Sequence, residues 1–184
     1  IVTAVSGVLI LGAFLGIALV TGSMDFSLRP ILAGELGMTA QLVLMGALLI
    51  GFGIKIPLFP FHTWLPDAHT EASTPVSVLL AGVLLKLGTY GLLRFCLGLF
   101  PDAWQVAAPW LAGWAAISVL YGSLAAIAQT DMKRMVAYSS VGHMGYVLLA
   151  AAATTPLGLM GALFQMVSHG LLSGVLFLVV GVVS

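Results

Sequence analysis

The stretch Lys55–Glu71, with the sequence KIPLFPFHTWLPDAHTE, decides the fold that we expect for this chain. It gathers a lysine, two histidines, an aspartate and a glutamate between long apolar runs, and it contains three prolines. Proline lacks a backbone N–H and its ring clashes with the preceding turn, so one continuous helix cannot pass through this stretch. We therefore expect the apolar segment that leads into it to form a broken or widely kinked helix.

The composition around this stretch predicts an all-α membrane protein. Of 184 residues, 61% are hydrophobic and only 7% are charged, and the mean hydropathy is +1.17. A soluble domain carries about 25% charged residues, so too little polar surface is left here to cover a soluble core. The net charge of zero argues against a nucleic-acid partner, which needs a basic surface. The single cysteine, Cys96, excludes an internal disulfide and a cysteine-based metal site.

Apolar runs long enough to cross a bilayer predict six transmembrane helices in one transmembrane region, residues 1–184. They are expected at 2–20, at 36–65 with the break at Pro57 and Pro60, at 76–93, at 103–130, and twice within 135–184, with a boundary at Thr154-Thr155-Pro156. Polar turns are expected at 66–74 and 131–134. The chain starts at Ile1 and ends within an apolar run, so we expect an internal fragment of a longer protein.

Lys86 is the most informative residue inside a span. Arg94 follows it by two helical turns, which places Lys86 about 12 Å deeper along the helix axis. A lysine near the centre of a span costs about 2.5–3.5 kcal/mol, and at this depth a lysine that reaches back to the surface fits poorly. The expected spans contain no acidic residue that could form a structural ion pair with it. We therefore expect Lys86 to belong to an ion pathway.

Lys55 lies beside the expected helix break. A lysine at a helix end can simply lie at the membrane surface. The carbonyl groups left unpaired by the prolines and the negative end of the preceding half-helix nevertheless favour a cation there. Broken helices whose ends face ions mark transport sites in membrane proteins, which favours a functional role for Lys55.

His143 and His169 lie in the middle of the last two expected spans. Each has polar neighbours one helical turn away, namely Ser139 for His143 and both Gln165 and Ser173 for His169. Histidine titrates nearest to neutral pH, which suits a proton relay. Hydrogen bonding between helices explains the pattern equally well, so both interpretations stay open on the residues alone.

The remaining ionisable residues of the opening stretch, His62, Asp67, His69 and Glu71, match no metal-binding spacing. We expect capping and turn chemistry there, with Asp67 or Ser73 near a helix start. We expect no metal ion and no cofactor in this chain, because no pattern that carries electrons is present.

Several long motifs occur in one order along the chain: KIP-x4-HTWLPDAH (55–69), LAGVLLKLGTYGLLR (80–94), AQTDMKR (128–134), AYSSVGHMG (137–145) and QMVSHG (165–170). Together they resemble the antiporter-like proton-pumping subunits of complex I, closest in form to the M-chain or chain-4 type. The resemblance extends from about Leu36 to the end of the chain. The run EASTPVS (71–77) looks like the versions found in photosynthetic bacteria.

This resemblance implies a larger bundle of about fourteen transmembrane helices with inverted repeats, of which the chain is the middle part. It implies that Lys55, Lys86, His143 and His169 form a proton relay at mid-membrane. The glutamate that pairs with Lys55 would precede Ile1, and the terminal ionisable residue of the relay would follow Ser184. The turns at 66–74 and 131–134 would face the cytoplasm or stroma, in agreement with the basic pair Lys133-Arg134.

The family resemblance further implies a chain without redox chemistry that pumps protons within an NAD(P)H- or ferredoxin-quinone oxidoreductase, with water and the other membrane subunits as partners. Its expected location is a bacterial inner membrane or a thylakoid membrane. Multisubunit cation/proton antiporters and membrane-bound hydrogenases use related subunits, so both remain alternatives. A third possibility is a structural membrane protein in which the buried lysines only hold helices together.

Overall fold

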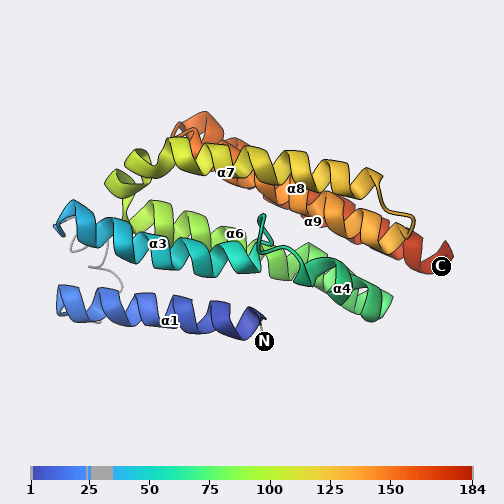
Figure 1. Ribbon diagram of the computed structural model, residues 1–184, viewed down its shortest axis with the longest axis horizontal. Helices are drawn as coiled ribbons and strands as arrows, with labels where there is room; N and C mark the ends of the chain where they lie inside the picture. Colours follow the sequence, from blue (N-terminus) through green and yellow to red (C-terminus); the bar gives the residue numbers. More distant parts are fainter. Residues whose placement is uncertain (1, 24, 26–34, 184) are drawn as a thin grey trace.

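The computed structural model describes residues 2–23, 25 and 35–183 of the chain. Long helices run roughly parallel to one another, with α1 along one edge and α7 along the other (Figure 1). The helix from Thr74 to Leu97 is continuous but changes its backbone pattern three times, between α-helical and π-helical segments. The elements are α1 (Val2–Thr21), α3 (Met38–Lys55), α4 (Trp64–Glu71), α5 (Thr74–Leu79), η1 (Leu80–Leu84), α6 (Leu85–Gly91), η2 (Leu92–Leu97), α7 (Pro101–Ile127), α8 (Met132–Ala152) and α9 (Pro156–Val183).

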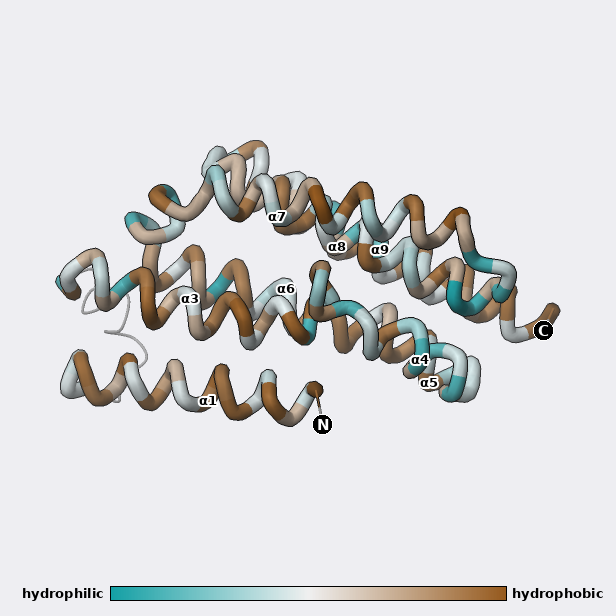
Figure 2. Tube along the Cα trace, viewed as in Figure 1, coloured by the Kyte–Doolittle hydropathy of each residue, from teal (hydrophilic) through white to brown (hydrophobic). Residues whose placement is uncertain are grey.

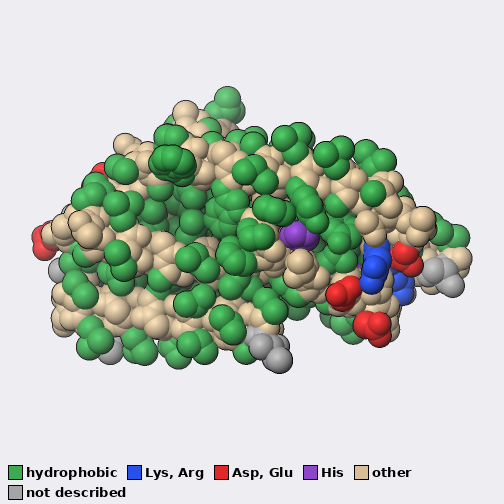
Figure 3. All heavy atoms as spheres, in the orientation of Figure 1, with side chains coloured by type: hydrophobic (Ala, Val, Ile, Leu, Met, Phe, Trp, Pro, Cys, Tyr) green, Lys and Arg blue, Asp and Glu red, His purple; other side chains and the backbone are tan. Residues whose placement is uncertain are grey.

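Six of the described helices are long and apolar enough to cross a membrane, which confirms the six expected spans. Apolar residues extend along almost every helix, and hydrophilic residues gather mainly near the connections (Figure 2). In the space-filling view the middle of the visible face is largely hydrophobic, and most charged side chains lie near the end that contains α4 (Figure 3). The last two spans separate where expected, since α8 ends at Ala152 and α9 begins at Pro156.

The expected break after Lys55 is confirmed. Helix α3 ends at Lys55, and α4 begins at Trp64, so that the two halves lie end to end with an irregular connection between them (Figure 1). The backbone N–H of Leu58 still reaches the carbonyl of Gly53, at 3.1 Å. Pro57 and Pro60 have no N–H to continue the pattern, so the helix ends here.

Side chains from outside the connection satisfy the backbone groups that the break leaves free. The indole of Trp64 donates a hydrogen bond to the carbonyl of Ile54, at 2.9 Å. Two groups of α7 hold Phe59: its N–H donates to Ser118 Oγ at 3.1 Å, and its carbonyl accepts from the indole of Trp114. These bonds fix the break to a neighbouring helix, because an unpaired backbone group in an apolar medium costs several kcal/mol.

The expectation of a polar turn over 66–74 is wrong for most of its length, because residues up to Glu71 belong to helix α4. Pro66 lies in the first turn of α4, where a missing N–H breaks no helical bond and proline is well tolerated. Asp67 and Ser73 do lie at helix starts, as expected. The residues that precede α4 and α5, Thr63 and Ser73, make no side-chain capping bond, so the expected capping bonds are not formed.

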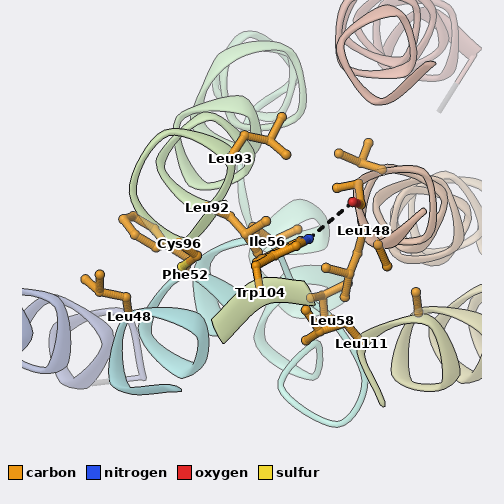
Figure 4. Packing of buried hydrophobic residues seen from close by; sticks show 14 of the residues in the cluster. Leu48, Phe52, Ile56, Leu58, Leu92, Leu93, Cys96, Trp104, Leu111 and Leu148 are labelled. Atoms are coloured by element: carbon orange, nitrogen blue, oxygen red, sulfur yellow. Dashed lines mark hydrogen bonds between the residues drawn. The ribbon is translucent and has the colours of Figure 1, made fainter. Parts of the chain in front are cut away.

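The largest apolar core lies where α3, the Thr74–Leu97 helix, α7 and α8 meet. Figure 4 shows leucines and aromatic residues of these helices around the fully buried Trp104, whose indole donates to the carbonyl of Ala151 at 3.3 Å. Phe52 of α3 stacks on Phe95 with ring centroids 6.2 Å apart. This core holds the two halves of the chain together beside the helix break.

Helices α7 and α8 pack at a distance that only glycine allows at Gly122. A Cβ atom added there would lie 2.5 Å from the backbone nitrogen of Gly142 and 3.0 Å from its Cα. These are backbone atoms that cannot rotate away. Gly113, also on α7, is exposed and has no atom within 4 Å of an added Cβ, so it provides a matched control.

We predict that Gly122→Ala lowers the stability of the purified full-length subunit by about 1–3 kcal/mol, the usual cost of overpacking a well-packed interface. Gly113→Ala is expected to be neutral or stabilising by up to about 1 kcal/mol, because alanine favours the helix. Thermal unfolding of both variants measures the difference. An equal effect of the two substitutions would contradict the close approach of α7 and α8.

Candidate functional site

Inside the bundle, polar side chains from three membrane-spanning helices meet. Hydrogen bonds link Lys86, His169 and Ser140, and the ring of His143 lies beside that of His169. Lys86 comes from α6, Ser140 and His143 from α8, and His169 from α9. The structure thus brings together three of the four residues that the sequence predicts as a relay. Lys55 lies apart from this group of polar side chains.

The Lys86 side chain makes two short hydrogen bonds. Its Nζ donates to the carbonyl of Ala81 at 2.5 Å and lies 2.6 Å from Nδ1 of His169. Ala81 belongs to η1, a segment with π-helical backbone bonding that directly precedes α6. Single π-helical turns within α-helices recur at functional sites. Lys86 is therefore held by a backbone oxygen of its own helix and a ring nitrogen of another.

Two glycines allow α9 to approach the Lys86 helix closely. A Cβ atom on Gly170 would lie 3.2 Å from the carbonyl oxygen of Gly82 and 3.3 Å from Cε of Lys86. Both contacts are tighter than usual, so the space beside the lysine stem is filled. The same glycines line a groove of about 460 Å³ that also borders Lys86.

His169 has a partner at each of its ring nitrogens. Nδ1 faces Lys86, and Nε2 lies 3.1 Å from Ser140 Oγ on α8. The side chain is 4% exposed, so water has little access to the ring. Ser173 donates to the backbone carbonyl of His169 at 2.5 Å, not to its ring. The polar stripe predicted on α9 (Gln165, His169 and Ser173) is present, but Ser173 bonds the backbone of His169 and Gln165 bonds His143.

His143 lies beside His169, with ring centroids 5.2 Å apart. Its Nδ1 is 2.9 Å from the amide nitrogen of Gln165, which comes from α9. The expected neighbour Ser139 instead donates to the carbonyl of Val136, at 2.7 Å. A pocket of about 90 Å³ borders both histidines and Gln165, which is room for a few water molecules.

Lys55 packs against α6, the helix that carries Lys86, but the two lysines border different spaces. Lys55 lines a cavity of about 380 Å³ together with Trp64, Leu84 and Leu85, and Lys86 does not border this cavity. A Cβ added at Gly88 would lie 3.3 Å from Cβ of Lys55, so the lysine packs directly against α6. No hydrogen bond or ion pair joins Lys55 to the part of the chain that the structure describes.

His62 and His69 do not join the group of polar side chains that contains Lys86. Both are buried, and neither ring has a hydrogen-bond partner among residues 2–23, 25 and 35–183. His69 stacks on Phe177 with ring centroids 4.3 Å apart, and His62 lies 4.8 Å from the ring of Tyr121. Their contacts are those of packed aromatic residues.

The two expected polar connections meet at the same end of the bundle. Arg134, at the start of α8, forms a 3.0 Å ion pair with Asp67 of α4, and both side chains are exposed. Asp131 caps α8 by accepting a 2.8 Å hydrogen bond from the backbone N–H of Arg134. The 131–134 turn and α4 therefore lie on the same side of the membrane.

Two contributors to the site were missed by sequence reasoning, the carbonyl of Ala81 and the hydroxyl of Ser140. A free carbonyl carries no side-chain signal. Ser140 is adjacent to Ser139, and the sequence alone gives no reason to prefer one serine over the other as a partner for the next helix. The presence of the serine pair was a visible signal, but its orientation was not.

Comparison with known proteins places this geometry in context. The family model described as NADH:quinone oxidoreductase/Mrp antiporter, TM, matches residues 1–184. A relative from Microcystis aeruginosa named NAD(P)H-quinone oxidoreductase chain 4 2 is 50% identical over 98% of this chain and 33% of its own length. NAD(P)H-quinone oxidoreductase chain 4-3 from Nostoc is 51% identical over 98% of this chain and 32% of its own. The chain spans about one third of these relatives.

Solved structures agree in fold. A chain of respiratory complex I from Thermus thermophilus with bound NADH aligns with a TM-score of 0.88 and 35% identity, over 98% of this chain and 39% of that one. A chain of the Mrp complex from Dietzia aligns with a TM-score of 0.89 and 26% identity, over 98% and 33%. With a family model matched along its whole length, this chain belongs to the transmembrane family shared by NADH:quinone oxidoreductases and Mrp antiporters.

Proposed function

We propose that this chain is the mid-membrane part of a proton-translocating, antiporter-like subunit of an NAD(P)H- or ferredoxin-quinone oxidoreductase. The observation that carries the proposal is the 2.6 Å contact between Lys86 Nζ and His169 Nδ1 inside two apolar spans. A cation at this depth is costly, and intramembrane ionisable residues mark proton and ion pathways. The names of the relatives that are about half identical support the same enzyme class.

In this proposal Lys86 and His169 exchange a proton directly. The ammonium group gives a proton to Nδ1, which leaves a neutral amine and an imidazolium. No backbone movement is required, because donor and acceptor are already within hydrogen-bond distance. Water in the 90 Å³ pocket then carries the proton to His143, whose ring lies beside that of His169. Gln165 orients the ring of His143 from α9.

Lys55 would hold or release its proton according to the position of a carboxylate partner in another part of the longer protein. Its place at the helix break suits this role, since the end of α3 presents carbonyl groups that favour a cation. The 380 Å³ cavity beside it gives room for a partner side chain or water. Because no described side chain links Lys55 to Lys86, water must bridge the two lysines.

The chain would carry no cofactor and no redox chemistry of its own. Electron transfer would belong to other subunits of the assembly, which would be its partners in a bacterial inner membrane or a thylakoid membrane. The energy would reach the Lys86 region through charge changes in neighbouring helices. A protein of this kind needs only positioned proton carriers, and Lys55, Lys86, His143 and His169 would be those that this part of the protein contributes.

We predict that Lys86→Ala in the intact assembly keeps normal assembly but loses most proton pumping, because His169 loses its proton donor. Lys133→Ala removes a lysine at the start of α8 and serves as the control that keeps pumping. Proton uptake by membrane vesicles during quinone reduction measures both. Normal pumping by an assembled Lys86→Ala variant would support a structural lysine and refute the relay.

A sodium-coupled antiporter is the second candidate, because the Mrp complex chain aligns with a TM-score of 0.89. The enzyme proposal predicts proton transport that depends on NAD(P)H or ferredoxin oxidation and continues without sodium. Ion transport by vesicles in sodium-free buffer, with and without the electron donor, separates the two. Transport that requires sodium and ignores the electron donor would establish the antiporter instead.

The orientation is also testable. We propose that α4 and the 131–134 turn face the cytoplasm or stroma. Glu71→Cys should then react with a membrane-impermeant thiol reagent from that side only, and Asp102→Cys at the start of α7 from the opposite side. The native Cys96 is buried and provides the background measurement. The reverse labelling pattern would invert the orientation.

A further inference from the structure

We infer that Ser140 is a positioning residue that accepts the Nε2–H of His169 and so stabilises the ring in the form whose unprotonated Nδ1 faces Lys86. The inference rests on the proposed relay and adds a group to it that lies outside the four predicted residues. The observations are the two short contacts of the His169 ring, one at each nitrogen, and the direction of the Ser140 hydroxyl.

The lysine determines which ring nitrogen must be free. A lysine ammonium has three N–H donors and no acceptor. One donor reaches the carbonyl of Ala81 at 2.5 Å and another points to Nδ1 of His169 at 2.6 Å. A hydrogen bound to Nδ1 would point at this ammonium hydrogen and repel it. The charged lysine therefore requires that Nδ1 carry a lone pair.

The proton of the neutral imidazole must then lie on Nε2, where it needs an acceptor. Ser140 Oγ is 3.1 Å from Nε2, and both side chains are buried. The serine is free to accept because its own hydrogen points to the carbonyl of Val136, also at 3.1 Å. The three hydrogen bonds therefore run in one direction: Lys86 donates to His169, His169 donates to Ser140, and Ser140 donates to the backbone of α8.

Loss of the hydroxyl would leave the ring with an unpaired donor. Without Ser140 Oγ the Nε2–H would be buried without an acceptor, a state that costs free energy. The ammonium of Lys86 still keeps the ring proton away from Nδ1. The cost is larger for the imidazolium that forms when Nδ1 takes the lysine proton, because a charged donor makes the stronger hydrogen bond to Ser140. The transfer between the two residues would be disfavoured although both side chains remain.

The experiment reads the ring itself. The intact assembly is prepared with ¹⁵N-labelled histidine, and solid-state NMR distinguishes Nδ1–H from Nε2–H; a His169→Gln sample assigns the signals by difference. In the native protein we expect His169 to be protonated at Nε2. In Ser140→Ala we expect His169 to keep its proton on Nε2 but to lose the proton chemical shift of a hydrogen-bonded N–H, with normal assembly and proton pumping reduced several-fold. Ser6→Ala is the control.

Ser6 matches Ser140 in being fully buried and in donating to a backbone carbonyl, that of Gly51, but it lies on α1 away from the relay. Ser6→Ala should leave the His169 signals and pumping unchanged. If the Nε2–H signal of His169 is unchanged in Ser140→Ala, the inference is overturned, even if pumping falls. A changed Nε2–H signal with undiminished pumping would overturn its role in transport. Because NMR does not depend on pumping, it tests Ser140 even if Lys86→Ala pumps normally.

Discussion

The site depends on one constraint: a lysine placed in the apolar interior must be held by groups that the protein itself supplies. Lys86 meets this condition with a backbone carbonyl on its own helix and an imidazole nitrogen on α9. Each partner needs a local departure from regular packing. The π-helical turn precedes the lysine, and paired glycines bring α9 close enough for His169 to reach it. The irregular backbone is thus the means by which a costly charge is accommodated.

The same constraint explains why the residues of the proposed relay differ in their surroundings. His169 is enclosed, with a partner at each nitrogen, whereas His143 borders a pocket and is exposed in this chain. Lys55 lies at a helix end and borders a cavity. An enclosed carrier transfers protons to fixed partners, and a carrier beside a cavity exchanges them with water or with a side chain from elsewhere. Enclosure is therefore greatest at His169, whereas both lysines are half-buried and His143 is exposed.

Much of this arrangement could be predicted from the sequence, because charges and prolines in apolar runs are strong signals. Lys86 was identifiable by its depth, and the helix break by Pro57 and Pro60. Pro66 is an ambiguous signal: proline marks turns, but it also fits the first turn of a helix, and α4 uses it there. The choice between Ser139 and Ser140 depends on the rotation of α8. That rotation is set by contacts with α7 at Gly122 and Gly142, which no local pattern encodes.

The anchoring of the helix break by α7 has a mechanical consequence. Trp64 bonds the last turn of α3, while Ser118 and Trp114 bond the connection itself, so both half-helices are fastened at their junction. A junction fastened in this way cannot serve as a pivot about which one bundle swings past another. Under the proposed function, any alternation of access at Lys55 would then come from rotation of side chains and rearrangement of water around a fastened backbone. The unit would work as a rigid frame with movable charges, unlike transporters that rock whole helices.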